Sequence, residues 1–139
     1  MIYEYTNDLP IVTASLYHAG QTISIQAVVD SGAMVSVLPY EDGVELGFIW
    51  EEQTLPVRLG GAGQGVPAYG ILVRGELAGI PPVALAFAWT RKTREEIRPL
   101  LGYTNFFQQF TVILTAYTHR FEIIPKNQNG VESVSNPTE

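Results

Sequence analysis

The hydrophobic pattern of the chain alternates over short segments rich in β-branched and aromatic residues, which predicts mostly β-strands. Strands are predicted over 11–17, 22–29, 50–59, 69–77, 82–89, 110–114 and 120–124. The first two are separated by His18-Ala19-Gly20-Gln21, a sequence that favours a hairpin turn. A single helical turn is predicted over 40–46, and short helices over 93–98 and 103–109. The predicted fold class is therefore mostly all-β, with one or two short helices.

Length and composition indicate one small globular domain. A chain of 139 residues, 46% of them hydrophobic, can bury a core of its own. Neither an internal repeat nor a linker marks a second unit, so we assign residues 1–126 to a single domain. Residues 127–139 are polar and contain glycine and proline, and this C-terminal tail is predicted to be flexible.

The charge balance narrows the classes of partner. With 14 acidic and 8 basic side chains the net charge is −6, which argues against nucleic acid because phosphate contacts need clustered Lys and Arg. The one basic run, Arg91-Lys92-Thr93-Arg94, is followed by two glutamates and is expected to be a solvated loop or helix start. No apolar stretch approaches the roughly 20 residues of a membrane span, and the first residues lack a signal-peptide pattern. We expect a cytoplasmic protein without a membrane partner.

Metal and cofactor chemistry is not indicated. The chain has no cysteine, which excludes disulfides, thiolate catalysis and cysteine-ligated zinc. His18 and His119 lie in predicted turns, where we expect them to be exposed rather than to bind a metal. We therefore expect neither a metal nor a cofactor.

The segment most informative about chemistry is Asp30-Ser31-Gly32-Ala33, which lies between the apolar residues 27–29 and a second apolar run. It places a carboxylate on a tight turn at the floor of a β-core. A buried carboxylate is costly unless it is hydrogen-bonded or shares a proton, so this position favours chemistry. Asp30 can hold or activate a water, and Gly32 allows the backbone and a bound peptide to approach closely. The alternative is an ordinary surface turn, because Asp-Ser-Gly is common in turns.

A second informative segment, Gly60-Gly61-Ala62-Gly63-Gln64-Gly65, has four glycines in six residues between two strand-like arms. This density predicts the mobile tip of a β-hairpin. A flexible surface hairpin without a functional role is the alternative. The partial match to a nucleotide-binding fingerprint is interrupted by Pro67 and followed by a predicted strand, so nucleotide binding is not expected.

Two motifs carry a resemblance to a known family. The run from Asp30 to Ala33 resembles the active-site loop of aspartic proteases, and Ala33 is more similar to the retroviral-type (retropepsin) branch than to the pepsin branch. About 70 residues later, Leu100-Leu101-Gly102 resembles the hydrophobic-hydrophobic-Gly element that precedes the C-terminal helix of that family. The resemblance covers roughly residues 9–125. It implies a closed, mostly antiparallel β-barrel of the acid-protease type, with endopeptidase activity.

The resemblance also implies roles for individual residues. The catalytic loop would consist of Asp30, Ser31 and Gly32. The glycine-dense tip would be the flap that closes over a peptide, with contacts from Gly61, Ala62 and Gly63. The implied pocket residues are Ala33, Met34, Val35, Val37 and Leu100. Because most of these are apolar, the resemblance favours hydrophobic side chains on either side of the cleaved bond.

The number of aspartates bears on the assembly. An aspartic protease of this family needs two carboxylates around one water, but of Asp8, Asp30 and Asp42 only Asp30 is followed by a hydroxyl residue and glycine. The resemblance therefore implies a twofold homodimer with one Asp30 from each subunit, acting on peptide or protein substrates. Ser31 of each subunit would then bond to the opposite loop. The alternative of a different class is a non-catalytic dimeric module that keeps the fold to bind peptides or a partner.

Overall fold

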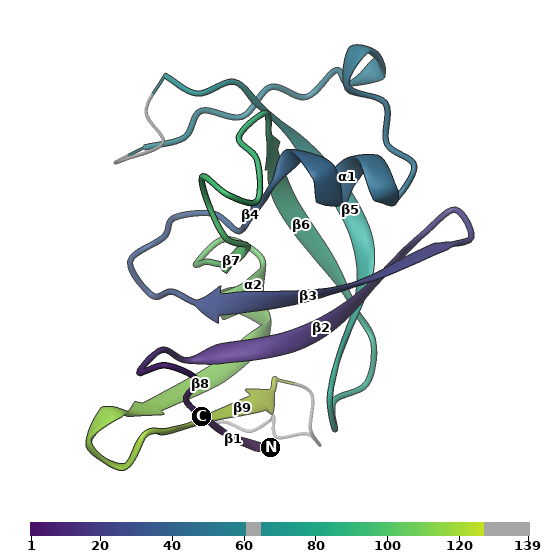
Figure 1. Ribbon diagram of the computed structural model, residues 1–139. Helices are drawn as coiled ribbons and strands as arrows, with labels where there is room; N and C mark the ends of the chain where they lie inside the picture. Colours follow the sequence, from purple (N-terminus) through teal and green to yellow (C-terminus); the bar gives the residue numbers. More distant parts are fainter. Residues whose placement is uncertain (61–64, 127–139) are drawn as a thin grey trace, which may run out of the picture.

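The computed structural model describes residues 1–60 and 65–126 and consists mostly of β-strands (Figure 1). The strands are β1 (Ile2–Glu4), β2 (Ile11–His18), β3 (Gln21–Val29), β4 (Val37–Leu38), β5 (Ala68–Leu77), β6 (Val83–Thr90), β7 (Leu100–Leu101), β8 (Phe110–Thr115) and β9 (Arg120–Pro125). The helices are α1 (Tyr40–Glu45) and α2 (Phe106–Gln109), with 3-10 turns η1 (Trp50–Glu52) and η3 (Ala116–Thr118). The predicted mostly-β class is confirmed. The predicted tail, 127–139, lies outside the described residues.

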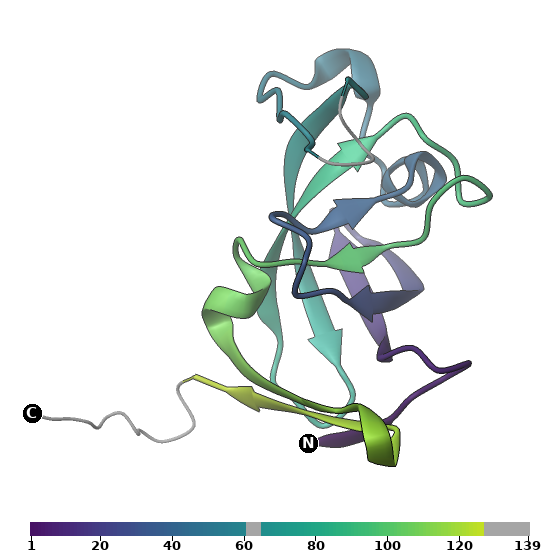
Figure 2. The ribbon, with the colours of Figure 1, turned by 90° about the vertical axis from the view of Figure 1, so that its left-hand side faces the viewer.

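Six strands hydrogen-bond in the order β2-β3-β7-β4-β6-β5, and β5 pairs again with β2, so the pairing forms a closed ring. Figure 2 shows β3, β7, β4 and β6 lying side by side. The β3–β7 and β4–β6 pairs are parallel, and the other pairs of the ring are antiparallel. The predicted β2–β3 hairpin is present, and Ala19 and Gly20 both adopt positive φ, as a tight two-residue turn between twisted strands requires.

The interior of the ring is filled by residues that alternate along the strands. In β2, Val12, Ala14 and Leu16 are buried while Thr13 is exposed, as the hydrophobic pattern predicts. Trp89 of β6 is the largest fully buried side chain, and its indole N–H donates to the carbonyl of Tyr40 in α1. This bond lets a polar ring enter the core without leaving a donor unpaired.

A second, three-stranded sheet in the order β1-β9-β8 lies at the lower end of the ring in Figure 1. Its core contact is Phe121 of β9, which stacks on Tyr3 of β1 with ring centroids 5.2 Å apart. Sequence analysis did not predict β1, because three residues are too few to show a period. Its strand conformation follows from pairing with β9, which is more than a hundred residues away in the chain.

Two elements predicted from the sequence, a strand over 50–59 and a helix over 93–98, are absent from the described structure. Residues 50–59 do not form a strand: Trp50 enters the turn η1 and packs on Trp89 and Tyr69, and the segment pairs with β5 only around Pro56. Residues 93–98 form one turn, in which Glu96 and Ile97 donate to the carbonyl of Thr93, rather than a helix. The predicted helix over 103–109 is shortened to α2, which begins after the capping residue Asn105.

Across the described segments, 1–60 and 65–126, the structure contains no helix with the length and hydropathy needed to cross a lipid bilayer.

Candidate active site

Asp30 lies directly after β3, where the chain leaves the ring. Its backbone N–H donates to the carbonyl of Leu101 in β7 at 2.9 Å, which continues the parallel β3–β7 pairing by one residue. The residue is half-buried. Its position is therefore fixed by two strands that come together only in the folded chain.

The turn that follows orients the Asp30 side chain. The N–H of Gly32 donates to Asp30 Oδ1 at 2.9 Å, and the N–H of Ala33 donates to the Asp30 carbonyl at 3.2 Å. Within the part of the chain that the structure describes, Asp30 Oδ2 accepts no hydrogen bond. One carboxylate oxygen is thus held by the loop, while the other is available to a water or a second acid.

The 33–36 segment is interlocked with the chain after β7. Tyr103 N–H donates to the Ala33 carbonyl at 2.8 Å, and Gly102 N–H donates to the buried Ser36 Oγ at 3.0 Å. A Cβ on Gly102 would lie 2.5 Å from the Val35 carbonyl oxygen and 2.8 Å from that of Ala33, closer than real Cβ atoms approach. Only glycine lets the two backbones come this close. The two sequence motifs therefore meet in space and support each other.

Asp30 lies at the edge of a cleft of about 490 Å³, which we call the Asp30 cleft. Its interior is an apolar cluster with charged side chains at the margin. The apolar side chains of the lining are Ala33, Met34, Val35, Val37, Leu59, Val66, Ile97 and Leu100, and the charged ones are Asp30, Arg58, Lys92 and Glu96. A site of this composition fits an extended peptide that carries at least one hydrophobic side chain.

The structure brings most of the predicted site residues together at this cleft. Its lining includes Asp30, Gly32, Ala33, Met34, Val35, Val37 and Leu100. Ser31 is exposed on the same turn and does not line the cleft. Met34 is 72% exposed, so its side chain is not enclosed by this chain. The predicted flap residues Gly61, Ala62 and Gly63 lie outside the described residues, although the arms that flank them pair through the N–H of Val57 and the carbonyl of Ala68.

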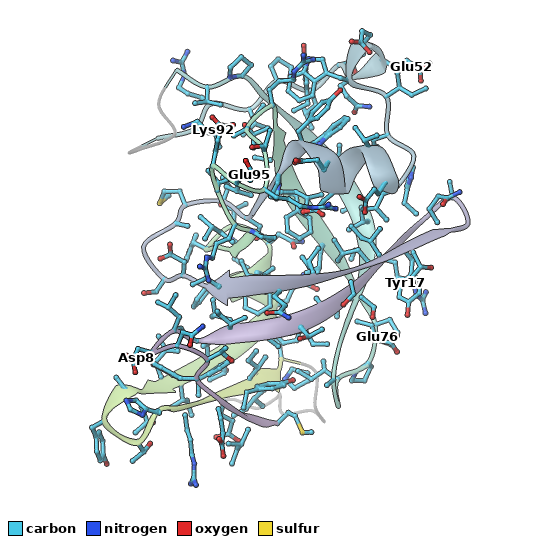
Figure 3. All side chains as sticks on the ribbon, in the orientation of Figure 1. Asp8, Tyr17, Glu52, Glu76, Lys92 and Glu95 are labelled. Carbon is cyan, nitrogen blue, oxygen red and sulfur yellow. The ribbon has the colours of Figure 1, made fainter. Side chains whose placement is uncertain are left out.

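Sequence reasoning missed the cations of the cleft. Arg58 comes from the segment before the glycine-dense tip, and Lys92 comes from the loop between β6 and β7, seen in Figure 3 with Lys92 and Glu95 labelled. The basic run 91–94 was expected to be a solvated loop, and nothing in its spacing shows which of its members faces a cleft. Ser36 was also missed as a structural residue. A hydroxyl inside an apolar run was the available signal for a buried hydrogen bond.

The same β6–β7 loop is anchored to α1 by Arg94. The Arg94 guanidinium donates to Asp42 Oδ1 at 2.6 and 2.9 Å and contacts Glu45 at 2.8 Å. Asp42 is buried, and this burial raises the pKa of its carboxyl, while the Arg94 charge acts in the opposite direction. The two carboxylates hold the pKa of the Arg94 guanidinium above its usual value. One wall of the Asp30 cleft is therefore tied to the helix by an ion pair.

A larger hollow of about 630 Å³ lies at the far end of the β2–β3 hairpin, between residues 17–22 and the β5–β6 turn region. Its titratable side chains are Tyr17, His18 and Arg74. His18 is half-buried, contrary to expectation, because its ring stacks on Phe48 at a centroid distance of 3.9 Å. Since none of the described acidic residues lines this hollow, the Asp30 cleft is the better candidate for acid–base chemistry.

Comparisons with known proteins agree with this geometry at the level of the fold. No family model matches the chain, and no curated protein matches it. Among solved structures, the chain is similar to the crystal structure of a retropepsin-like aspartic protease from Rickettsia conorii. The TM-score is 0.65 at 15% sequence identity, and the match covers 88% of this chain and 88% of that one. At this identity the similarity establishes a retropepsin-like fold.

The contact around Gly102 predicts a specific stability defect. We expect Gly102→Ala to lower the free energy of unfolding by roughly 2–3 kcal/mol, because the new Cβ must displace backbone carbonyls rather than a side chain. Gly60→Ala is the matched control, since a Cβ at that position would have no heavy atom of the described residues within 4 Å and its φ is not positive. Urea unfolding followed by circular dichroism measures both variants. Equal losses in the two variants would contradict the interlock.

The Arg94–Asp42 pair predicts a pH-dependent defect. We expect Arg94→Met to cost roughly 2 kcal/mol at pH 7, less than a fully buried pair because the Arg94 side chain is 45% exposed. Without Arg94 the pKa of Asp42 rises further, since burial is then opposed by no cation. An acid whose folded pKa is raised loses stability as pH increases through that pKa, so the defect should shrink as pH falls toward 4.

Urea unfolding of wild type and Arg94→Met across this pH range measures the effect. Glu45→Gln is the control, because Glu45 is half-exposed and its pair with Arg94 is expected to be worth no more than about 0.5 kcal/mol. A defect of Arg94→Met that stays constant with pH would show that Asp42 does not carry the effect.

Proposed function

We propose that this protein is an aspartic endopeptidase that acts as a homodimer, with one Asp30 from each subunit. The observation that carries the proposal is the position of Asp30, which has one oxygen held by Gly32 at the edge of a mostly apolar cleft. The retropepsin-like fold, which the aspartic protease from Rickettsia conorii also has, supports the same assignment. The proposed domain is residues 1–126, with 127–139 as a tail.

The distribution of carboxylates supports a second copy. Asp42 is buried and paired with Arg94, and Asp8 lies 3.6 Å from His119 and does not line the Asp30 cleft. Glu96 lines the cleft, but its Oε1 accepts a hydrogen bond from the backbone N–H of Thr93 in its own turn. We therefore propose that the second acid of the pair is the Asp30 of another subunit. Ser31, which is exposed on the turn, is proposed to bond to the opposite loop.

In the proposed reaction the two carboxyl groups share one proton and hold a water between them. The ionised carboxylate takes a proton from this water as its oxygen attacks the carbonyl carbon of the peptide bond. The protonated carboxyl donates its proton to the carbonyl oxygen. The tetrahedral intermediate then collapses and its C–N bond breaks, as the proton taken from water passes to the leaving nitrogen. The other carboxylate takes a proton from one hydroxyl of the intermediate, which becomes the carbonyl of the new carboxyl group, and the pair again shares one proton.

Substrate preference is proposed from the apolar part of the cleft. Val35, Val37 and Leu100 contribute to the same apolar cluster, which favours a hydrophobic side chain next to the cleaved bond. The glycine-dense tip is proposed as the flap that excludes water during the reaction. The two segments that flank this tip are joined by a hydrogen bond from the N–H of Val57 to the carbonyl of Ala68. Leu59 and Gly60, which follow in the first segment, line the Asp30 cleft.

The first test replaces the proposed catalytic acid. We expect Asp30→Asn to abolish cleavage of a peptide library while leaving a folded dimer, because the amide has the size of the carboxyl but cannot act as the base. Asp8→Asn, at an exposed position that does not line the cleft, is the control and should keep wild-type activity. Turnover by Asp30→Asn at the wild-type rate would refute the assignment. Wild-type protein that binds peptides without cleaving them would instead favour the non-catalytic binding module.

The second test addresses the assembly. We expect activity per subunit to fall steeply on dilution, because one subunit supplies only half of the proposed site. Sedimentation velocity and peptide cleavage measured over one concentration series should share a single midpoint. A monomer with full activity would refute the homodimer.

A further inference from the structure

The cations of the Asp30 cleft point to a more specific substrate class than a hydrophobic peptide. The chain has a net charge of −6, yet of its eight basic side chains four lie within residues 91–98 and a fifth is Arg58. Arg58 and Lys92 both line the Asp30 cleft. An acidic protein that places two of its few cations in one cleft offers an acidic ligand group local partners of opposite charge there, beside the cleft's own acids Asp30 and Glu96.

Two other cations of the loop, Arg94 and Arg91, already have partners. Arg94 is paired with Asp42 and Glu45, and the Arg91 guanidinium lies over the rings of Tyr40 and Trp50, 4.9 and 5.3 Å from their centroids. Within residues 1–60 and 65–126, by contrast, neither Arg58 nor Lys92 has a carboxylate oxygen within 4.0 Å. Glu96, the other charge on this loop in the cleft, is engaged by Thr93. The two cleft cations are therefore available to a ligand.

Both cations are held at the cleft by their backbone. Lys92 N–H donates to Oγ1 of the buried Thr90, and the Lys92 carbonyl accepts from Tyr40 N–H at 2.8 Å. Arg58 lies between Val57 and Leu59, which both pack into the apolar cluster of the cleft. A ligand that reaches this cluster with a hydrophobic side chain therefore enters a cleft lined by two cations whose Cα positions are set.

We propose that the Asp30 cleft selects peptide segments in which an ionised Asp or Glu lies close in sequence to the hydrophobic side chain that enters the cleft. The inference rests on the proposed function for the cleavage step, but the recognition step needs only the cleft. Direct pairs between an acidic side chain and Arg58 or Lys92 act at short range. The repulsion from distant acidic residues is screened beyond about 8–10 Å at physiological ionic strength. Asp30 and Glu96 line the same cleft, so the preference for an acidic side chain is expected only at the substrate positions nearest to Arg58 and Lys92.

The test uses a hydrophobic peptide in which one residue is set to Glu, Gln or Lys at each position in turn. Binding is measured with Asp30→Asn protein by fluorescence anisotropy, and cleavage with wild type as kcat/KM, both at low ionic strength and at pH 5.5 to 6. For at least one position, we expect the peptide with Glu to bind about threefold to tenfold more tightly than the peptide with Gln. The peptide with Lys at that position should bind more weakly than the peptide with Gln. The Glu advantage should decrease with added salt and below pH 4, where the carboxyl is protonated.

Variants identify the cations responsible. Arg58→Gln and Lys92→Gln should each reduce the Glu-over-Gln ratio, and the double variant should bring it close to one. Arg74→Gln is the matched control, because Arg74 is exposed on β5 and lies at the other hollow. Equal affinity for Glu and Gln peptides at every position, or a ratio unchanged in the double variant, would overturn the inference. If Asp30→Asn protein shows the preference but wild type cleaves nothing, the peptidase assignment fails while the recognition inference stands.

Discussion

The close contact between the loop after β3 and the chain after β7 is the constraint on which the rest of the structure depends. The N–H groups of Gly102, Tyr103 and Thr104 all bond to the 33–36 segment, and the absent side chain of Gly102 is what permits the approach. Because Asp30 is bonded at the same place to Leu101, this one contact sets both the position of the acid and the apolar side of the cleft. Rigid support of this kind lets an acid on a turn keep a defined position.

Asp30 and Asp42 differ both in burial and in the groups that they contact. Asp42 is the buried aspartate, and its partner is a cation that fastens a loop to a helix. Asp30 is only half-buried, with one oxygen bonded to a backbone N–H and the other open. The buried aspartate is therefore part of a structural ion pair, whereas the proposed catalytic aspartate is a half-buried carboxylate that lines a cleft.

The features that could be predicted from sequence are those with a local signature. Alternation in β2 predicts which residues face the core, and the Asp30 and Leu100-Leu101-Gly102 motifs predict the residues that meet at the cleft. The unpredicted features depend on contacts distant in sequence. β1 is a strand only because β9 pairs with it, and Trp50 avoids a strand because Trp89 and Tyr69 offer an aromatic contact. Arg58 and Lys92 line the same cleft only because the segment before the glycine-dense tip and the β6–β7 loop pack on the same apolar cluster.

The aromatic contacts of Trp50 with Trp89 and Tyr69 also give the molecule an intrinsic fluorescence signal. Trp50 and Trp89 are the chain's two tryptophans, and their ring centroids are 5.2 Å apart. Trp50 also packs on Tyr69, which lies in the arm that leads from the glycine-dense tip, and the Arg91 guanidinium lies over the Trp50 ring. Tryptophan fluorescence therefore arises entirely from a cluster that touches this arm and the β6–β7 loop. A change in the position of either element alters the surroundings of the emitting indoles, so a ligand that moves the arm or the loop can be followed without a label.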